Sequence, residues 1–407
     1  MGRRHAYSPG VTIAAPTDKL TVGRRTEGRA LYLDCNATTP LDPRVRDEVV
    51  YYLDDEFGNA GSRTHLYGQA AKERVNAARA QVGAVVAASS DEVIFTSGAT
   101  ESNNLALLGL VDQGQATGRR HIVSTRIEHK AVLEPLEALA ALGFEITLLD
   151  PTAGGWIDPA AVAAAVRPDT LLVSLMAVNN ETGVIQPIQE IADRLAHEEP
   201  YIHVDAAQAF GKIIDPLRHP RLDLISVSGH KIHGPKGVGA LVARRRGYRR
   251  PPLRPLMYGG GQERGLKPGT LPVPLIAGLG TASELAGAEH EQRSKLCGRI
   301  KAGLLEALHP LHAEVNGDQD RVVSHTLNVS VPGVDSEAAI LALKDLVAIS
   351  NGSACTSQKY DPSHVLLAMG YDEPRIRGAL RFSWSYMTED IDWSPMVGRL
   401  RALQRPL

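Results

Sequence analysis

The feature that most restricts the fold of this chain is an alternation of short apolar runs with helical patterns between about residues 45 and 245. Short apolar runs are typical of buried strands, and strands that alternate with helices form βαβ units around a mostly parallel sheet. The expected strands are Val93–Thr96, His121–Ser124, Glu145–Leu149, Leu171–Val178, Tyr201–Val204, Leu224–Val227 and Gly239–Ala243, and the expected helices are Glu101–Val111, Lys130–Ala141, Pro159–Val166 and Pro187–His197. The sequence therefore predicts an α/β fold with a seven-stranded sheet. Its ligand should lie beyond the carboxyl ends of the strands.

The chain of 407 residues is long enough for two domains. Near residue 290 the pattern changes to a long helix, followed by strand-like residues at Thr326–Val331 and further helix. This change predicts a second, smaller α+β domain. We expect a large domain at 46–288 and a small domain formed by 31–45 and 289–407.

Composition excludes several classes of protein. The formal net charge of −2 gives no support for direct binding of nucleic acid, and no apolar stretch is long enough to cross a membrane. The three cysteines are far apart, which argues against a disulfide framework and for a reducing, cytoplasmic compartment. Since no two cysteines are closely spaced, no metal site is expected. Residues 1–30 have no hydrophobic period, and no apolar segment follows Arg3 and Arg4, so we expect a flexible extension rather than a secretion signal.

One lysine stands where a buried strand should end. Lys231 lies in the glycine-rich segment SGHKIHGPKGVG (228–239), directly after the apolar run Leu224–Val227. A lysine removed from water has a lowered pKa, so its free amine becomes a usable nucleophile. Schiff-base formation with a carbonyl, above all that of pyridoxal phosphate (PLP), needs such an amine. By itself, the segment is equally compatible with a glycine-rich turn that contains an incidental lysine.

A carboxylate ends the preceding strand. Asp205 closes the run YIHVD, where a buried carboxylate is costly unless it meets a cation such as a protonated pyridine nitrogen. The 26 residues between Asp205 and Lys231 (231 − 205) leave room for one return to a neighbouring strand. Gln208 follows one turn later and could donate to the phenolic oxygen of the ring. The other interpretation is that Asp205 caps a helix.

Other polar residues also follow predicted strands. The segment TSGATE (96–101) would place hydroxyls and free N–H groups at a helix N-terminus, where Thr100, Ser228 and His230 could bind one phosphate, although plain helix capping fits equally well. His129 could stack on an aromatic ring or transfer protons, or it could be structural. Asn180 could orient a ring substituent or serve as a turn residue.

Two further residues suggest a substrate and its chemistry. Arg381 is a single arginine in an apolar run, so it could bind a carboxylate through two parallel hydrogen bonds or form an ion pair between domains. Cys355 lies in SNGSACTSQKYDPS, a small and polar segment typical of a mobile loop, where a thiol can act as a nucleophile. Cys35 and Cys297 lack such surroundings and are interpreted as structural.

Together these residues resemble the cysteine desulfurases of the NifS/IscS family, which are fold-type I PLP enzymes related to class-V aminotransferases. The resemblance covers roughly residues 31 to 390, and NGSACTS (351–357) is its most specific motif. The other motifs are LYLDCNATTP (31–40), SGATESNN (97–104), EHKAV (128–132), VNNETG (178–183), HVDAAQ (203–208), SGHKIHGPKGVG (228–239) and GGGQERG (259–265).

The resemblance implies a sulfurtransferase reaction in which L-cysteine becomes L-alanine and Cys355 becomes a persulfide. Lys231 would be the Schiff-base lysine that takes the α-proton, and His129 would stack on the ring and assist proton transfer. The implied cofactor contacts are Ala99, Thr100, His129, Asn180, Asp205, Gln208, Ser228, His230, Lys231 and Thr270, the last from the second subunit of a homodimer. The implied substrate contacts are Asn36, Asn180 and Arg381.

The chain departs from the family at two places. Lys267 and Pro268 replace the usual Arg-Ser before Gly269-Thr270, and the residues Trp384–Met387 are bulkier than usual, which predicts a narrower substrate entrance. The persulfide would pass to an acceptor protein of iron–sulfur assembly, tRNA thiolation or DNA phosphorothioation, and the desulfurase of DNA phosphorothioation is one candidate identity. Alternative functions are a selenocysteine lyase or another PLP-dependent lyase or aminotransferase. A non-catalytic sulfur carrier or scaffold is an alternative of another class.

Overall fold

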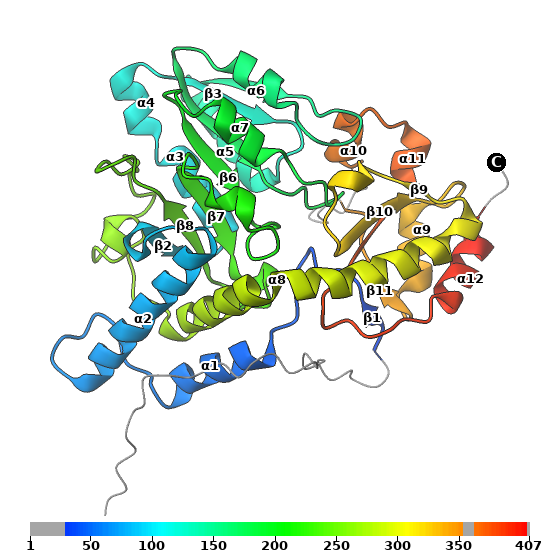
Figure 1. Cartoon of the computed structure of the whole chain (residues 1–407), viewed down its shortest axis with the longest axis horizontal. Helices are drawn as coiled ribbons and strands as arrows, with labels where there is room; N and C mark the ends of the chain where they lie inside the picture. The colour runs from blue at the N-terminus through cyan, green and yellow to red at the C-terminus, as the bar shows by residue number, and fades with distance from the viewer. Residues whose placement is uncertain (1–28, 353–361, 405–407) are drawn as a thin grey trace, which may run out of the picture.

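The computed structural model describes residues 29–352 and 362–404. Within these residues, seven strands form one sheet in the order β2-β8-β7-β6-β5-β3-β4 (Figure 1). The strands are β2 (Val93–Thr96), β3 (His121–Thr125), β4 (Glu145–Leu149), β5 (Thr170–Met176), β6 (Tyr201–Asp205), β7 (Leu224–Ser228) and β8 (Gly239–Ala243). β8 runs in the direction opposite to the other six strands, which are parallel to one another. The prediction of a mostly parallel, seven-stranded sheet is therefore confirmed.

Helices cover both faces of this sheet. They are α1 (Pro43–Asp54), α2 (Leu66–Val85), α3 (Ala99–Leu108), α4 (Val111–Thr117), α5 (Lys130–Ala141), α6 (Pro159–Ala165) and α7 (Ile188–Arg194). Successive strand residues enter different apolar clusters, as Leu172 and Val173 do on β5. This burial on both faces explains why the strands are continuous apolar runs rather than alternating ones.

A smaller unit contains two short sheets. β12 (Ala379–Ser383), β10 (Thr326–Ser330) and β9 (Glu314–Val315) pair antiparallel, while β1 (Leu31–Tyr32) pairs parallel with β11 (Val347–Ala348). The helices α9 (Ser336–Leu343) and α12 (Ser394–Leu403) pack in this unit, whereas α10 (His364–Ala368) and α11 (Glu373–Arg377) bury their apolar residues in the cluster of the large unit. The smaller unit has its own apolar cluster around the fully buried Trp384. The predicted α+β character of this part is therefore correct.

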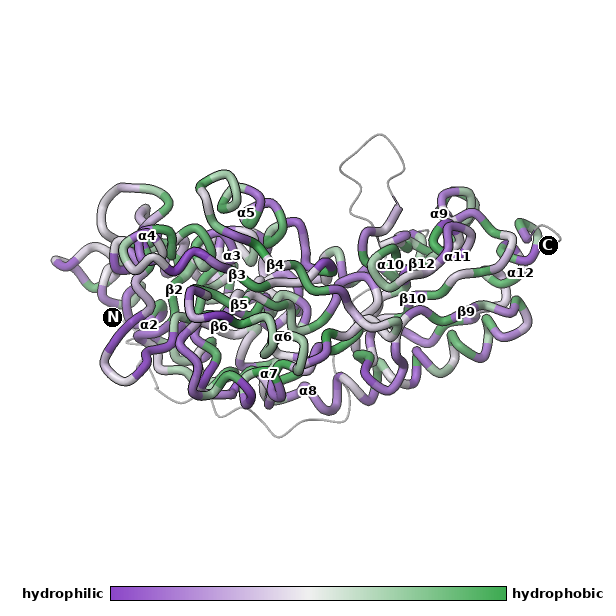
Figure 2. Tube along the Cα trace, turned by 90° about the horizontal axis from the view of Figure 1, so that it is seen from above, coloured by the Kyte–Doolittle hydropathy of each residue, from purple (hydrophilic) through white to green (hydrophobic). Residues whose placement is uncertain are grey.

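The long helix α8 (Val273–Leu308) runs alongside both units, as Figures 1 and 2 show. Its first half contributes Ile276 and Leu279 to the core of the large unit, and its last turns contribute Leu304 and Leu308 to the small one. The sequence analysis placed the start of this helix near residue 290, which is wrong by several turns. The predicted domain boundary at 288/289 falls inside α8, and the division into two domains stays a prediction.

The expected helix Glu101–Val111 is in fact two helices, α3 and α4, because the chain turns at Gly109 and Leu110. No helix among the described residues is long and apolar enough to span a membrane.

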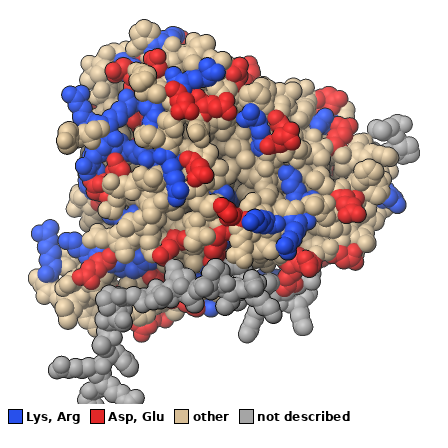
Figure 3. All heavy atoms as spheres, viewed as in Figure 1, with Lys and Arg blue, Asp and Glu red and all other residues tan. Residues whose placement is uncertain are grey.

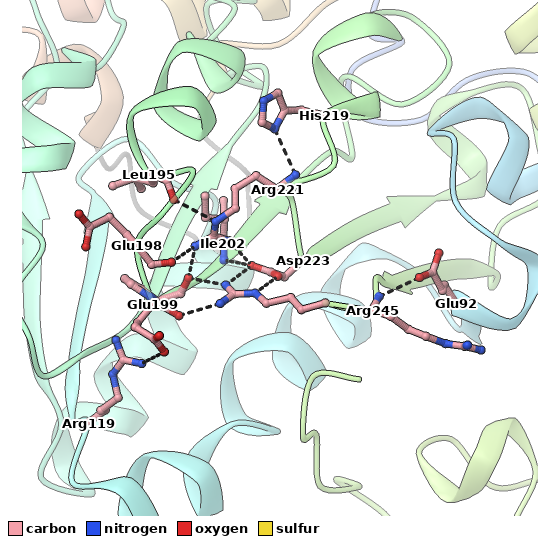
Figure 4. Close-up of polar contacts among 12 residues, drawn as sticks. Glu92, Arg119, Leu195, Glu198, Glu199, Ile202, His219, Arg221, Asp223 and Arg245 are labelled. Carbon is pink, nitrogen blue, oxygen red and sulfur yellow. Dashed lines mark hydrogen bonds and ion pairs between the residues drawn. The ribbon is translucent and has the colours of Figure 1, made fainter. Parts of the chain in front are cut away.

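A network of ion pairs and hydrogen bonds around Asp223 connects the segments at the edge of the sheet where β6 and β7 begin. Asp223, just before β7, accepts hydrogen bonds from the Ile202 backbone N–H (2.7 Å) and from Arg221 Nη1 (2.7 Å). Figure 4 shows Asp223 at the centre of this network, with Arg221 bridging onward to the Leu195 carbonyl. Since the buried Asp223 carboxylate is paired at this edge, its charge is compensated there.

Gly239 on β8 offers a test of the packing that places the start of α3. A Cβ on Gly239 would lie 2.6 Å from Gly98 Cα and would also clash with the Val227 carbonyl. We expect Gly239→Ala to lower the free energy of unfolding by roughly 1–3 kcal/mol through overpacking. Gly298→Ala in α8 is the control, because no atom lies within 4 Å of its added Cβ, and it should leave stability unchanged or raise it by up to about 1 kcal/mol. Urea unfolding of both variants measures the difference.

Candidate functional site

The predicted site residues meet at one edge of the large sheet. Asp205 is the last residue of β6, and Lys231 ends a short 3₁₀ turn (Gly229–Lys231) that directly follows β7. His129 follows β3, and α3 begins directly after β2. Because β3, β6 and β7 run in the same direction, their carboxyl ends open onto the same side.

Lys231 is surrounded by neutral oxygens and by other cations. Its Nζ donates to the carbonyls of Ala37 (2.9 Å) and Asn36. Burial, together with the nearby charges of Lys212 and Arg381, lowers the pKa of the amine to about 7. At neutral pH a large fraction of Lys231 is therefore the free amine, which is the nucleophilic form.

Asp205 is buried and held by amide donors. Its Oδ2 accepts from Asn103 Nδ2 (2.7 Å), and its Oδ1 accepts from the Ala207 backbone N–H (2.9 Å). Among the described residues, no lysine, arginine or histidine nitrogen lies within 4.0 Å of this carboxylate. The site therefore contains a buried carboxylate without a cation beside an amine without a carboxylate.

PLP, the cofactor expected from the sequence, fits these two unpaired groups. It carries an aldehyde for the amine of Lys231 and a ring nitrogen that, when protonated, would supply the cation that Asp205 lacks. A buried, unpaired carboxylate is costly in free energy, so the arrangement is suited to a bound cation. The residues present fit this group.

The expected phosphate contacts surround the N-terminus of α3. Ser228 Oγ lies 3.6 Å from the position of a Cβ on Gly98, which immediately precedes α3, so the bare glycine leaves room beside the hydroxyl. Ala99 and Thr100 form the first turn of α3. His230 Nδ1 lies 3.2 Å from Thr38 Oγ1, and burial lowers the pKa of His230 to about 4.

Thr270 lies on the exposed loop before α8, as a contact to a second subunit requires. Its expected role remains a prediction.

The segment 34–39, from which the sequence analysis took only Asn36 as an expected substrate contact, makes hydrogen bonds across the site. Asn36 O accepts from Gln208 Nε2 (2.9 Å) as well as from Lys231, and Asn36 Nδ2 donates to the Asn180 carbonyl (3.1 Å). Thr39 Oγ1 donates to the His230 carbonyl (2.9 Å). Residues 34–39 thus bring together side chains that are up to about 200 positions apart in the sequence.

Arg381 lies on β12 and forms an ion pair with Asp34, which the sequence analysis assigned to the same small domain, while binding of a substrate carboxylate remains a prediction. Its Nη2 forms an ion pair with Asp34 Oδ1 (2.7 Å), and its Nη1 donates to the Asn180 carbonyl (3.0 Å). Its Nε is buried without a hydrogen-bond partner among the described residues. The backbone of Arg381 also exchanges two hydrogen bonds with Ser350 (2.6 and 3.2 Å). The guanidinium is fixed in place and keeps one donor for a further acceptor.

His129 and Glu128 occupy the loop between β3 and α5. His129 Nδ1 accepts from the Ala131 backbone N–H (3.0 Å) and caps α5, and burial lowers its pKa. Glu128 Oε1 accepts from Thr125 Oγ1 (2.7 Å) and from the Met176 backbone N–H (3.0 Å), while its Oε2 has no partner among the described residues. Burial raises the pKa of Glu128 to about 8, so it is mostly a neutral acid at pH 7.

The two described cysteines lie in buried positions that fit a structural role. Cys35 and Cys297 are buried, and burial raises the pKa of each thiol to about 12, which keeps both protonated and unreactive. Cys355 lies outside the described residues.

The bulky residues expected to narrow the substrate entrance are buried, and Trp384 and Tyr386 line one cavity with Lys231, so the narrower entrance remains a prediction. Trp384 is buried and donates to the Cys297 carbonyl (2.9 Å), while Tyr386 donates to Asp42 Oδ2 (2.6 Å).

The sequence analysis missed three residues that support the site: Asp34, Asn103 and Lys212. Each could have been found only by an indirect signal. Asn103 is a fully buried amide on α3, Asp34 follows a strand-like run, and Lys212 stands one helical turn after Gln208. The sequence does not reveal the partners of Asp34 and Asn103, because these partners, Arg381 and Asp205, are far away along the chain.

Comparison with known proteins agrees with this geometry. Residues 31–392 match the family model described as aminotransferase class-V. The chain is 45% identical over 381 residues to the cysteine desulfurase IscS of Dechloromonas aromatica, covering 92% of this chain and 93% of the relative. The structure is similar to the crystal structure of DndA from Streptomyces lividans (54% identity, 86% of this chain and 98% of that chain, TM-score 0.77). It is also similar to SspA in complex with cysteine (35% identity, 87% and 98%, TM-score 0.77).

The raised pKa of Glu128 gives a testable pH dependence. The folded protein keeps the proton up to about pH 8, whereas the unfolded chain loses it near pH 4.5, so the free energy of unfolding should fall as the pH rises through this window. Glu128→Gln removes this effect, and its stability relative to the wild type should rise by roughly 3–4 kcal/mol between pH 5 and pH 8. Urea unfolding of the apoproteins measures this trend. Glu137→Gln, an exposed change on α5, should show no such trend, and parallel pH profiles for Glu128→Gln and the wild type would contradict the assignment.

Proposed function

Since the chain belongs to the aminotransferase class-V family and is a PLP-dependent cysteine desulfurase, we propose that Lys231 and Asp205 hold its cofactor and that Cys355 accepts the sulfur. The observation that carries this proposal is, among the described residues, an amine without a carboxylate partner and a carboxylate without a cation partner at one sheet edge. PLP, when bound, supplies a ring that takes up the electrons released when the α-proton of L-cysteine leaves. The protein's own residues perform the remaining steps.

Lys231 performs the proton transfer. A large fraction of its amine is unprotonated at pH 7, so Lys231 Nζ can take the α-proton of the substrate. Asp205, fixed by Asn103, keeps the ring nitrogen protonated. His129 stacks on the ring, and its lowered pKa makes it a neutral acceptor for the thiol proton of the substrate. Asn180 and Gln208 surround the phenolic oxygen.

The remaining cofactor and substrate contacts follow from the same arrangement. Ala99, Thr100, Ser228 and His230 hold the phosphate, with Thr270 added from the partner subunit. Arg381 binds the substrate carboxylate through its unpartnered Nε, and the ion pair with Asp34 fixes the plane of the guanidinium. Asn36 lies between Lys231 and Asn180 and orients the substrate.

Cys355, as a thiolate, attacks the sulfur of L-cysteine, leaving L-alanine and a Cys355 persulfide that passes to an acceptor protein. The similarity to DndA at 54% identity favours an acceptor in DNA phosphorothioation over one in iron–sulfur assembly. On the face seen in Figure 3, Lys and Arg side chains lie among Asp and Glu side chains, and the arginines after β8 pair with Asp91 and Asp112. This mixture, and the net charge of −2, favour a protein acceptor in the cytoplasm over direct binding of nucleic acid.

The protein acts as a homodimer. Large apolar side chains are exposed at the end of α1 and the start of α2, namely Leu53, Phe57, Leu66 and Tyr67, with exposed fractions between 51% and 80%. Contiguous exposed apolar side chains are typical of protein interfaces. Tyr258, 87% exposed on the loop that leads to Thr270, is a second such residue, and a dimer that covers this loop also explains the expected role of Thr270.

The assigned roles predict different losses for two variants. Lys231→Ala should abolish alanine formation and the long-wavelength absorbance of bound PLP, because the attachment amine is gone. Cys355→Ser should keep that absorbance and lose the persulfide, with alanine formation reduced by roughly a hundredfold or more. Incubation with L-cysteine, followed by alanine assay and mass spectrometry, measures both.

Cys297→Ala is the matched control and should still form the persulfide, since its thiol is buried. Undiminished alanine formation by Cys355→Ser would reject the persulfide step. Selenide release from selenocysteine that survives Cys355→Ser, together with inactivity toward L-cysteine, would favour a selenocysteine lyase.

The dimer proposal is tested by placing charged side chains on the exposed apolar surface. The double change Phe57→Glu and Leu66→Glu should convert the protein to a monomer in sedimentation analysis, because two carboxylates would be desolvated at the interface. Leu341→Glu on α9, which is also exposed at 67%, should leave the dimer intact. A wild-type monomer, or an unchanged mass of the double variant, would contradict the proposal.

A further inference from the structure

A second lysine lies close to the site and has no counter-charge. Lys212 is partly buried beyond the end of β6, and burial lowers the pKa of its amine to about 8. Within the described part of the chain, no carboxylate oxygen lies within 4.0 Å of its Nζ. Burying a lysine without a counter-ion lowers the stability of the fold, which indicates that Lys212 has a function at this place.

The contacts of Lys212 lead directly to Lys231. Lys212 Nζ donates to Gln208 Oε1 (3.4 Å) and lies 3.2 Å from His325 Nε2. With its oxygen held by Lys212, Gln208 turns its amide nitrogen toward the Asn36 carbonyl, to which Nε2 donates (2.9 Å). The same carbonyl accepts from Lys231 Nζ. Three hydrogen bonds therefore join the two amines.

The two lysines also act on each other through space. Both line one cavity of about 230 Å³, together with Cys35, Cys297 and His325. The two thiols are protonated, and burial holds the pKa of His325 well below its ordinary value, so the neighbours of Lys212 are neutral.

Around Lys231 the balance of charge differs. The charged groups that act on it are Lys212, Arg381, Asp34 and Asp205. Arg381 and Asp34 compensate each other as an ion pair, while the carboxylate of Asp205 favours a proton on Lys231. Among the described residues, Lys212 is the cation without a paired carboxylate that opposes this proton.

We propose that Lys212 is a positioning residue for Lys231: it orients the Gln208 amide toward the Asn36 carbonyl, and its charge repels a proton from Lys231 Nζ. The result is a Lys231 held in place as a free amine. The inference rests on the proposed function of Lys231 as the residue that reacts with the cofactor, and it adds the group that keeps this amine reactive. Lys212 acts through its neighbours and does not touch the reacting atoms.

The test measures proton binding by Lys231 in the apoprotein, without any enzyme turnover. Apoprotein is exposed briefly to PLP at a series of pH values, reduced with borohydride, and the labelled Lys231 peptide is quantified by mass spectrometry. In the wild type, labelling should rise with a midpoint near pH 7. In Lys212→Met, which keeps the length of the side chain, the midpoint should rise by about one pH unit, a tenfold change in proton affinity. Lys212→Arg keeps the charge and should retain the wild-type midpoint.

Lys301→Met is the matched control, because Lys301 on α8 is also removed from water and its charge also acts on His325. It should leave the midpoint of Lys231 unchanged. The proposal is overturned if Lys212→Met has the wild-type midpoint, or if Lys301→Met shifts it equally. No label on Lys231 in the wild type would instead reject the proposed function of Lys231. Circular dichroism of each apoprotein, compared over the same pH range, verifies that the labelled variants are folded.

Discussion

The arrangement of the site follows from two ionisable groups, a carboxylate and an amine, that the fold keeps away from opposite charges. Asp205 is buried against an amide and a backbone N–H, and Lys231 faces carbonyl oxygens. Each group costs free energy in this position, because a buried charge without a partner is unfavourable. The cost is offset when a molecule with a cationic ring nitrogen and an electrophilic carbonyl binds between them. The folded chain is thus unsatisfied until its cofactor is present, and binding and stability are linked.

The rest of the fold serves to hold these groups at one edge. Parallel strands place their carboxyl ends together, and residues 34–39 then lie across that edge with hydrogen bonds to the segments that follow β6 and β7. The helix α8 packs on the cores of both units, so the edge of the large sheet and the strand that carries Arg381 share one support. The paired charges at Asp223 lie at the opposite edge. The two edges of the sheet thus differ: the carboxylate of Asp223 is paired with arginines at one edge, and the carboxylate of Asp205 has no cation partner among the described residues at the other.

Much of this arrangement was predictable, because it depends on local patterns. Apolar runs identified the strands of the large sheet, and polar residues at strand exits identified Asp205, Lys231 and His129. The start of α8 was misjudged because its first half is buried and apolar, and therefore lacks the polar face that marks a helix in a sequence. The roles of Asp34 and Asn103 were not predictable, since folding alone brings their partners near them. The role of Lys212 was not predictable either, because no sequence pattern indicates its hydrogen bond to Gln208. The assignment of Cys355 rests on the sequence motif around it, because Cys355 itself lies outside the described residues.

The two backbone hydrogen bonds between Ser350 and Arg381 have a consequence for how such enzymes diversify. They attach the beginning of the sulfur-carrying segment to the residue proposed to bind the substrate carboxylate. On the other side of that segment, Ser363 caps α10 and donates to Glu181, next to Asn180. Both attachment points therefore belong to the substrate site and not to the segment itself. Changes between residues 351 and 362 that retain the thiol of Cys355 can alter which acceptor receives the sulfur, while the residues proposed to hold the cofactor and the substrate stay the same. In this architecture, partner choice and bond cleavage can evolve separately.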